Sequence, residues 1–116
     1  MGYEAVVFSY WLATPPTNQG RGSGMTHTIK IWPNHFANVV SGKKRAELRL
    51  NDRNYQVGDT VLLDEWSPTR STWTGSECKV VITHVITGDV IGLMPEYCVF
   101  SFNVERVYIH EKGPSS

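Results

Sequence analysis

The chain has 116 residues, enough for one ordinary domain and too few for two. Its 11 basic residues balance its 11 acidic residues, so the net charge is zero and a polyanion-binding protein that depends on overall charge is excluded. Two cysteines, Cys78 and Cys98, cannot build a disulfide framework, and with no secretion signal they predict buried thiols in a reducing, cytoplasmic location.

The first two dozen residues differ in composition from the rest of the chain. The apolar stretch 5–13, AVVFSYWLA, is too short to span a bilayer, and Glu4 stands where a signal peptide would carry positive charge. The stretch TPPTNQGRGSG that follows is typical of a flexible linker. We therefore expect no membrane association, a flexible extension over 1–24, a domain over 25–110 and a disordered tail at 111–116. The alternative for the apolar stretch is an added edge strand or a contact with a partner.

The domain is predicted to begin with a strand and a short helix. In HTIKIW, residues 27–32, isoleucines alternate with polar residues, which predicts a strand with one buried side. Pro33 supplies a φ angle suited to a helix start, and apolar residues recur at i, i+3 and i+4 from Phe36. Gly42 is typical of a helix end. We therefore predict an amphipathic helix over 33–41 that packs on a sheet.

The remaining chain is predicted to be mainly strand. Turn residues are concentrated in NDRNYQVGD (51–59), SPTRSTWTGSE (67–77) and GDVIGLMPEY (88–97). The strands expected between and after these turns are TVLLDEW (60–66), CKVVITHVIT (78–87) and CVFSFNVERVYIH (98–110). Together these elements predict an α+β fold that is mostly β, a small compact barrel with one short helix near the start of the domain.

The stretch GKKRAELR, residues 42–49, contains five charged side chains and raises the question of a functional site. The period of a strand puts Ala46, Leu48 and Leu50 on the core side and Arg45, Glu47 and Arg49 on the other. The charged side is either a solvated strand surface with weak ion pairs or part of a working site. The second interpretation is favoured by Lys44, which stands at the corner between helix and strand, where side chains from two elements can converge on a cleft.

This stretch resembles the motif Gly-x-Lys-x-x-Glu-x-Arg of the ASCH domains, members of the PUA-like superfamily, at Gly42, Lys44, Glu47 and Arg49. The longer stretch KIWPNHFANVVSGKKRAELRLNDRNYQVGDTVLLDEW is similar to the front of a small bacterial and phage family of uncharacterised ASCH-like proteins, and GLMPEYCVFSF is similar to its closing segment. The resemblance covers roughly residues 26–104. It implies a PUA-like β-barrel in which the motif lines a cleft beside the helix, and a ligand that is RNA or a nucleotide.

The resemblance makes an RNA- or nucleotide-binding module our leading expectation. Glu47 is expected to accept a hydrogen bond from the exocyclic amino group of cytosine or adenine, Arg49 to hold a phosphate, and Trp32 to stack on the base. Lys44 completes the expected ligand-binding set. We expect no metal and no cofactor, because the four histidines lack metal-ligand spacing. The expected partner is RNA or a nucleotide-like small molecule, and the oligomeric state stays open.

Two alternatives remain. One bacterial ASCH group resembles this chain and is an amidohydrolase that removes acetyl from acetylcytidine, with a lysine at the place of Lys44, a threonine at the place of Glu47 and a downstream glutamate. For such an enzyme, Lys44 and Glu47 would be the catalytic candidates and Glu96 a weaker second acid. The chain departs from that group because glutamate replaces the threonine nucleophile. The last alternative is a phage or bacterial accessory interaction protein.

Overall fold

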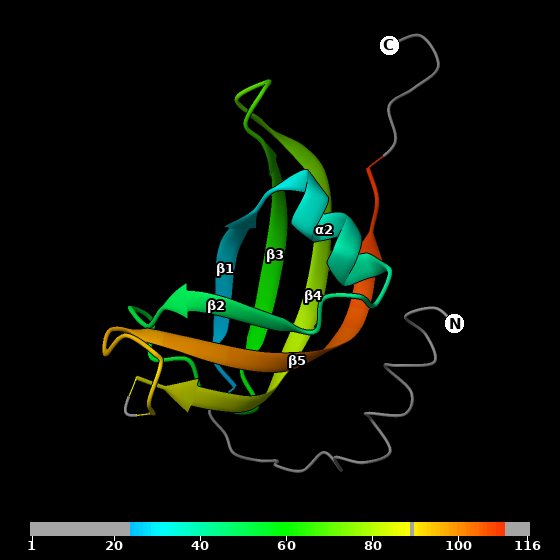
Figure 1. The fold of residues 1–116 in the computed structure, drawn as a ribbon. Coiled ribbons are helices and arrows are strands. Elements are labelled where there is room, and N and C mark those ends of the chain that lie inside the picture. The colour runs from blue at the N-terminus through cyan, green and yellow to red at the C-terminus, as the bar shows by residue number, and fades with distance from the viewer. Residues whose placement is uncertain (1–23, 89, 111–116) are drawn as a thin grey trace, which may run out of the picture.

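The structure is a computed structural model that describes residues 24–88 and 90–110 (Figure 1). In chain order its elements are β1 (Thr26–Ile31), α2 (Pro33–Val40), β2 (Ala46–Leu50), β3 (Thr60–Ser67), β4 (Thr72–Thr87) and β5 (Tyr97–Tyr108). The expectation of a mostly β domain with one short helix near its start is confirmed for the described part of the chain.

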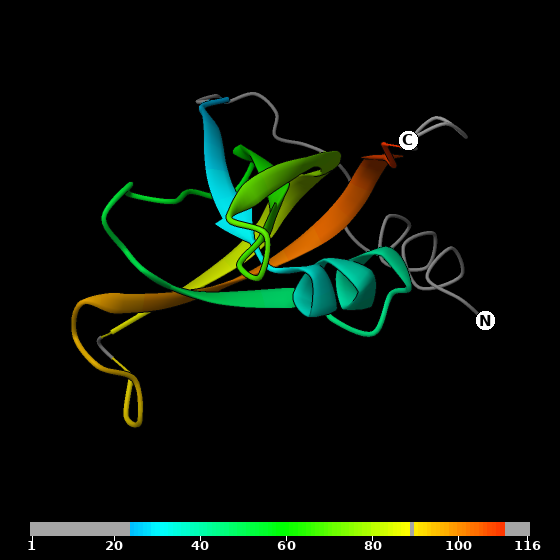
Figure 2. The same cartoon turned by 90° about the horizontal axis from the view of Figure 1, so that it is seen from above.

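All the strands belong to one sheet in the order β1-β3-β4-β5-β2. β1 pairs with β3 in parallel, and the other neighbouring strands are antiparallel. The sheet is strongly curled, as the view from above in Figure 2 shows. β4 shifts register against both of its neighbours, and such bulges bend a strand. The expected barrel is not closed, because β1 and β2 remain the two edges of this half-barrel.

Helix α2 carries the chain from one edge of the sheet to the other, because β1 precedes it and β2 follows it (Figure 1). Pro33 opens the helix as predicted, and Phe36 and Val39 are its buried residues. Gly42, with φ of 87°, adopts the left-handed conformation that lets the chain leave the helix. The connection then places Lys44 two residues before the start of β2.

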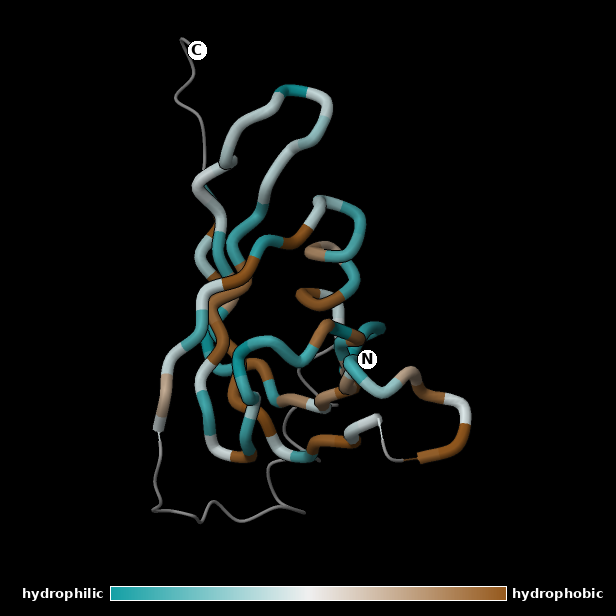
Figure 3. The backbone as a smooth tube through the Cα atoms, turned by 90° about the vertical axis from the view of Figure 1, so that its left-hand side faces the viewer, coloured by the Kyte–Doolittle hydropathy of each residue, from teal (hydrophilic) through white to brown (hydrophobic). Residues whose placement is uncertain are grey.

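The core is formed by apolar side chains from the strands and the helix, and the hydrophobic positions recur along these elements in Figure 3. Its buried members are Ile29, Ile31, Phe36, Val39, Tyr55, Val61, Leu63, Cys78, Val80, Ile82, Cys98, Phe100 and Phe102. Burial of a large apolar side chain contributes about 1.5 to 3 kcal/mol. The fold therefore rests on the inner sides of β3, β4 and β5, which supply most of these residues.

A buried histidine–aspartate pair holds the segment between β2 and β3 to the core. The fully buried Asp59 accepts a hydrogen bond from the Gln56 backbone N–H at 3.1 Å, and the same carboxylate oxygen lies 2.8 Å from Nε2 of His27. The backbone carbonyl of Asp59 accepts from the Ile82 N–H at 2.9 Å. The ring of Tyr55 packs edge-on against His27, with 4.8 Å between ring centroids. These contacts tie the predicted turn to β1 and β4.

β4 begins earlier than the sequence predicted. The sequence predicts a loop over 67–77, whereas the structure has a turn at 68–71 and starts the strand at Thr72. Trp66 and Trp73 stand opposite each other across the hairpin, with ring centroids 5.0 Å apart. Such an aromatic cross-strand pair stabilises the additional strand pairing. The polar sequence SPTRST between the two tryptophans, which is typical of a turn, concealed this extension.

Residues 1–23 and 111–116 lie outside the described residues, so the N-terminal extension and the C-terminal tail stay predictions. The same holds for the apolar stretch 5–13 and its two interpretations. Among residues 24–88 and 90–110, the structure contains no helix with the length and hydropathy of a membrane span.

Candidate functional site

Strand β2 turns Glu47 toward the inside of the sheet, opposite to the sequence expectation. Glu47 is only 8% exposed, whereas Leu48 is 57% and Leu50 is 46% exposed. The register explains this arrangement: Glu47 pairs with the fully buried Phe100, and Leu48 pairs with Val99 on the other side of β5. Directly opposite residues of neighbouring strands share one face of a sheet. The prediction that Leu48 and Leu50 face the core is therefore wrong.

Glu47 is held between two cations. Nζ of Lys44 lies 3.2 Å from Oε1 of Glu47, and Nε of Arg49 donates to Oε2 at 3.1 Å. The Glu47 side chain is 10% exposed, compared with 25% for Lys44 and 28% for Arg49. Lys44 comes from the connection after α2, while Glu47 and Arg49 alternate along β2. The corner between helix and strand thus brings these three predicted residues together.

Arg49 also joins the two edges of the sheet. Its Nη2 donates to the backbone carbonyl of Lys30 on β1 at 2.6 Å. β1 and β2 are the edge strands, and no backbone ladder joins them in the described part of the chain. A guanidinium group suits both contacts because its donors point in several fixed directions. We call the junction formed by Lys30, Lys44, Glu47 and Arg49 the seam.

One oxygen of Glu47 retains the capacity for a hydrogen bond. Oε1 is buried, and although Lys44 lies within ion-pair distance, no donor among the described residues is aligned with this oxygen as a hydrogen-bond partner. The Lys44 ammonium, 3.2 Å away, compensates part of the cost of burying this oxygen, although the pair is not aligned as a hydrogen bond. A ligand that supplies an aligned donor would add the hydrogen bond that this oxygen lacks. Glu47 is therefore a positioned acceptor inside the seam.

An aromatic residue from the segment after β2 lies next to the seam. The Tyr55 ring lies 4.9 Å from that of Phe100, which is the cross-strand partner of Glu47. Burial raises the pKa of Tyr55, and the positive charges of Arg53 and Arg49 oppose this rise. The Tyr55 hydroxyl group is consequently protonated at neutral pH and adds no charge to the seam.

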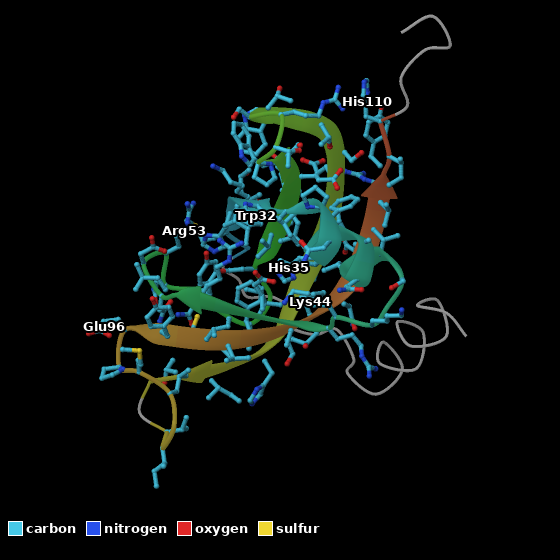
Figure 4. All side chains as sticks on the ribbon, turned by 45° about the horizontal axis from the view of Figure 1, so that its top comes forward. Trp32, His35, Lys44, Arg53, Glu96 and His110 are labelled. Carbon is cyan, nitrogen blue, oxygen red and sulfur yellow. The ribbon has the colours of Figure 1, made fainter. Side chains whose placement is uncertain are left out.

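Trp32 and Glu96 take no part in the ion pairs of the seam. Trp32 precedes α2 beside the end of β1 and is 52% exposed (Figure 4). Glu96 lies before β5, far from Lys44 in the view of Figure 4, and its backbone carbonyl accepts from the Asn51 N–H at 2.8 Å. Glu96 is thus not placed as a second acid beside Lys44. The described residues contain no group of three His, Cys, Asp or Glu side chains that could hold a metal ion.

Lys30 is the residue of the seam that the sequence pattern does not predict. Its backbone carbonyl binds Arg49, while its ammonium group lies over the Trp66 ring, 4.4 Å from the centroid, and 5.7 Å from the Trp73 centroid. The alternation of β1 predicts an outward side chain at this position. The contact with the tryptophans depends on the pairing of β1 with β3 and of β3 with β4, which no local pattern reveals.

The fold and the seam define a small, open half-barrel domain with an ion-paired, nearly buried glutamate at one edge of its sheet. The chain belongs to the DUF3850 family, a domain of unknown function, which matches residues 26–102. It is similar to an uncharacterized 12.9 kDa protein in the GpA 3′ region of Escherichia phage P2, with 44% identity over 59 residues. That alignment covers 51% of this chain and 52% of the phage protein, so the chain spans about half the length of this relative. All residues of the seam lie within the family match.

Proposed function

We propose that this domain is an ASCH-like member of the PUA-like superfamily that binds RNA or a nucleotide at the seam. The observation that carries the proposal is the Glu47 carboxylate, which is nearly buried, held by Lys44 and Arg49, and left with a buried oxygen that lacks an aligned donor. A solvated strand surface does not account for this arrangement, because solvated charges need neither burial nor two fixed partners.

The chemistry of the seam matches the edge of a nucleobase. A carboxylate oxygen accepts from the exocyclic amino group of cytosine, and of adenine by the same geometry. Lys44 and Arg49, each about one-quarter exposed, keep donors at the solvent side of Glu47 that can meet a carbonyl or phosphate oxygen. The balanced charge of the chain supports a local site that binds few phosphates. We place the domain in the cytoplasm as part of this proposal, because its two cysteines are buried free thiols.

Titration of the full chain with nucleoside monophosphates and short single-stranded RNA tests the proposal by NMR or calorimetry. We expect Glu47→Gln to weaken binding of cytidine monophosphate by about tenfold or more, because it replaces a charged acceptor with a neutral amide. Glu105→Gln is the matched control. Glu105 forms an exposed ion pair with Lys79 at 3.4 Å on another part of the sheet, and its substitution should leave binding unchanged.

The same titration separates the proposal from its alternatives. Equal affinities of the Glu47 and Glu105 variants would contradict a site at the seam. Release of acetate from acetylcytidine, lost in the Lys44→Ala variant, would instead assign the hydrolase activity. A further outcome is that the chain binds none of these compounds and shows unchanged NMR signals at Lys44, Glu47 and Arg49. That result would mean that the charged residues have only a structural role.

A further inference from the structure

A second surface begins where the seam ends, on the outward side of β1, β3 and β4. Its centre is the pair Trp66 and Trp73, with ring centroids 5.0 Å apart and planes at 75°. Trp73 is 52% exposed, and the Lys30 ammonium lies 4.4 Å from the Trp66 centroid. We call Lys30, Trp66 and Trp73 the tryptophan platform. None of the three belongs to the buried core.

The tryptophan platform and the seam share one residue. The Lys30 carbonyl accepts from Arg49 at the edge of β1, and the Lys30 side chain continues onto the outer face of the sheet to Trp66. The pairing of Ile31 with Glu65 brings the end of β1, where Trp32 follows, to the level of Trp66 on β3. A ligand that leaves the seam over the edge of β1 therefore meets exposed aromatic residues at once.

Resting on the function proposed above, we infer that the tryptophan platform stacks the bases of single-stranded RNA whose anchoring nucleotide lies in the seam. Every base offers a π-face, and stacking on exposed indole rings binds bases without regard to their sequence. Lys30, whose backbone carbonyl accepts from Arg49 and whose ammonium lies over the Trp66 ring, supplies a cation for the connecting phosphate. Because the platform binds further bases, we expect the nucleotide in the seam to belong to an oligonucleotide and not to be a free mononucleotide.

The charges near the platform indicate that stacking, not a positive field, provides this binding. Asp64 is in register with Lys30 on one side and with Glu77 on the other. Burial raises the pKa of Glu77, and a hydrogen bond with Asp64 and its charge raise it further. Acidic groups therefore lie beside Lys30, which is the only cation among the described residues that contacts these rings. We expect the platform's contribution to depend only weakly on salt concentration.

The test compares cytidine monophosphate with a single-stranded RNA hexamer of cytidine on the full chain. Six equivalent bases alone would raise the apparent affinity about sixfold, and one further stacked base multiplies this by about 5 to 150. We expect the hexamer to bind more than tenfold tighter than the monophosphate. Trp73→Ala should remove the stacking part of this gain and leave the monophosphate affinity unchanged. Trp73→Phe should retain most of it, because a smaller aromatic ring remains.

Tyr97→Ala is the control, since Tyr97 lies at the other end of the sheet, opposite Leu50. The inference is overturned if Trp73→Ala keeps the full hexamer gain, or if it weakens the hexamer and the monophosphate equally. Failure of the proposed function has a different signature, in which Glu47→Gln leaves the monophosphate affinity unchanged. Two results together support both the proposed function and the tryptophan platform. The extra affinity for the hexamer disappears in Trp73→Ala but persists in Tyr97→Ala, and binding of the monophosphate depends on Glu47.

Discussion

Arg49 and Lys30 join the two edges of the sheet through a single hydrogen bond of 2.6 Å from the guanidinium group to a backbone carbonyl. Nε of the same guanidinium donates to Oε2 of Glu47 at 3.1 Å. One side chain thus fixes both the width of the half-barrel opening and the orientation of the acceptor inside it. This dual role makes Arg49 the residue through which the fold and the candidate site are coupled.

Arg49→Lys should destabilise the domain by about 1 to 2 kcal/mol. An ammonium group keeps the charge but cannot donate in two fixed directions to Glu47 and Lys30, and the partial exposure of Arg49 reduces the loss. Urea denaturation followed by circular dichroism measures the change. Arg53→Lys is the control, because Arg53 is 46% exposed and pairs only loosely with Asp52 at 3.8 Å. Equal losses in the two variants would show that the bond to Lys30 contributes nothing.

The two faces of β2 show where the sequence was informative and where it was not. Alternation correctly separated Glu47 and Arg49 from Leu48 and Leu50, because a strand projects successive side chains to opposite sides. Which face is buried depends on the neighbouring strand, and here Phe100 assigns the inner face to Glu47. Leucine usually prefers the interior, and this preference therefore predicted the wrong buried face for β2.

Leu48→Asp should therefore be tolerated, with a loss below about 1 kcal/mol, although the alternation pattern alone predicts unfolding. The new carboxylate would face solvent on the outer side of the sheet. Leu63→Asp is the matched comparison: Leu63 is 0% exposed, so the same substitution buries an unpaired charge and should prevent folding. Thermal denaturation of both variants measures the difference. A Leu48 variant as unstable as the Leu63 variant would mean that β2 is inverted relative to this structure.

Local chemistry predicted the elements better than it predicted their contacts. Pro33 and Gly42 marked the ends of the helix, since each favours a particular backbone conformation. The contact of Lys30 with Trp66 and the pair formed by His27 and Asp59 join distant parts of the chain. Such contacts follow from strand order, which composition and periodicity do not encode. The seam could thus be predicted where it is local, at Lys44, Glu47 and Arg49, and not at Lys30.

Asp59→Ala should destabilise the domain by about 2 to 4 kcal/mol. The substitution leaves the buried His27 ring and the partly buried Gln56 N–H without their acceptor. Urea denaturation measures the loss, and Asp52→Ala provides the control because the Asp52 side chain is 55% exposed. The prediction fails if both alanine variants lose less than about 0.5 kcal/mol, since the buried pair would then contribute no more than a surface carboxylate.

The two buried cysteines predict slow thiol reactivity in the native chain. Cys78 and Cys98 are both 0% exposed. Burial raises the pKa of Cys78 to about 12, with a smaller contribution from the charge of Glu77, and burial also raises the pKa of Cys98. At pH 8 only about one Cys78 in ten thousand would be a thiolate, the form that reacts. A colorimetric thiol reagent should therefore label neither cysteine within minutes in buffer and both in urea. Immediate labelling of the native chain would contradict the burial.

The same burial predicts that the domain loses stability in alkali. An unfolded cysteine releases its proton near pH 9, whereas folded Cys78 keeps it until about pH 12, so the folded state binds more protons between these values. The contribution is fully present below pH 9 and declines as pH rises toward 12. We expect the urea midpoint to fall between pH 8.5 and about 10.5, and to fall less in a Cys78→Ala variant. An identical decline in both proteins would assign the alkaline effect to other groups, among them Tyr55, whose pKa burial also raises.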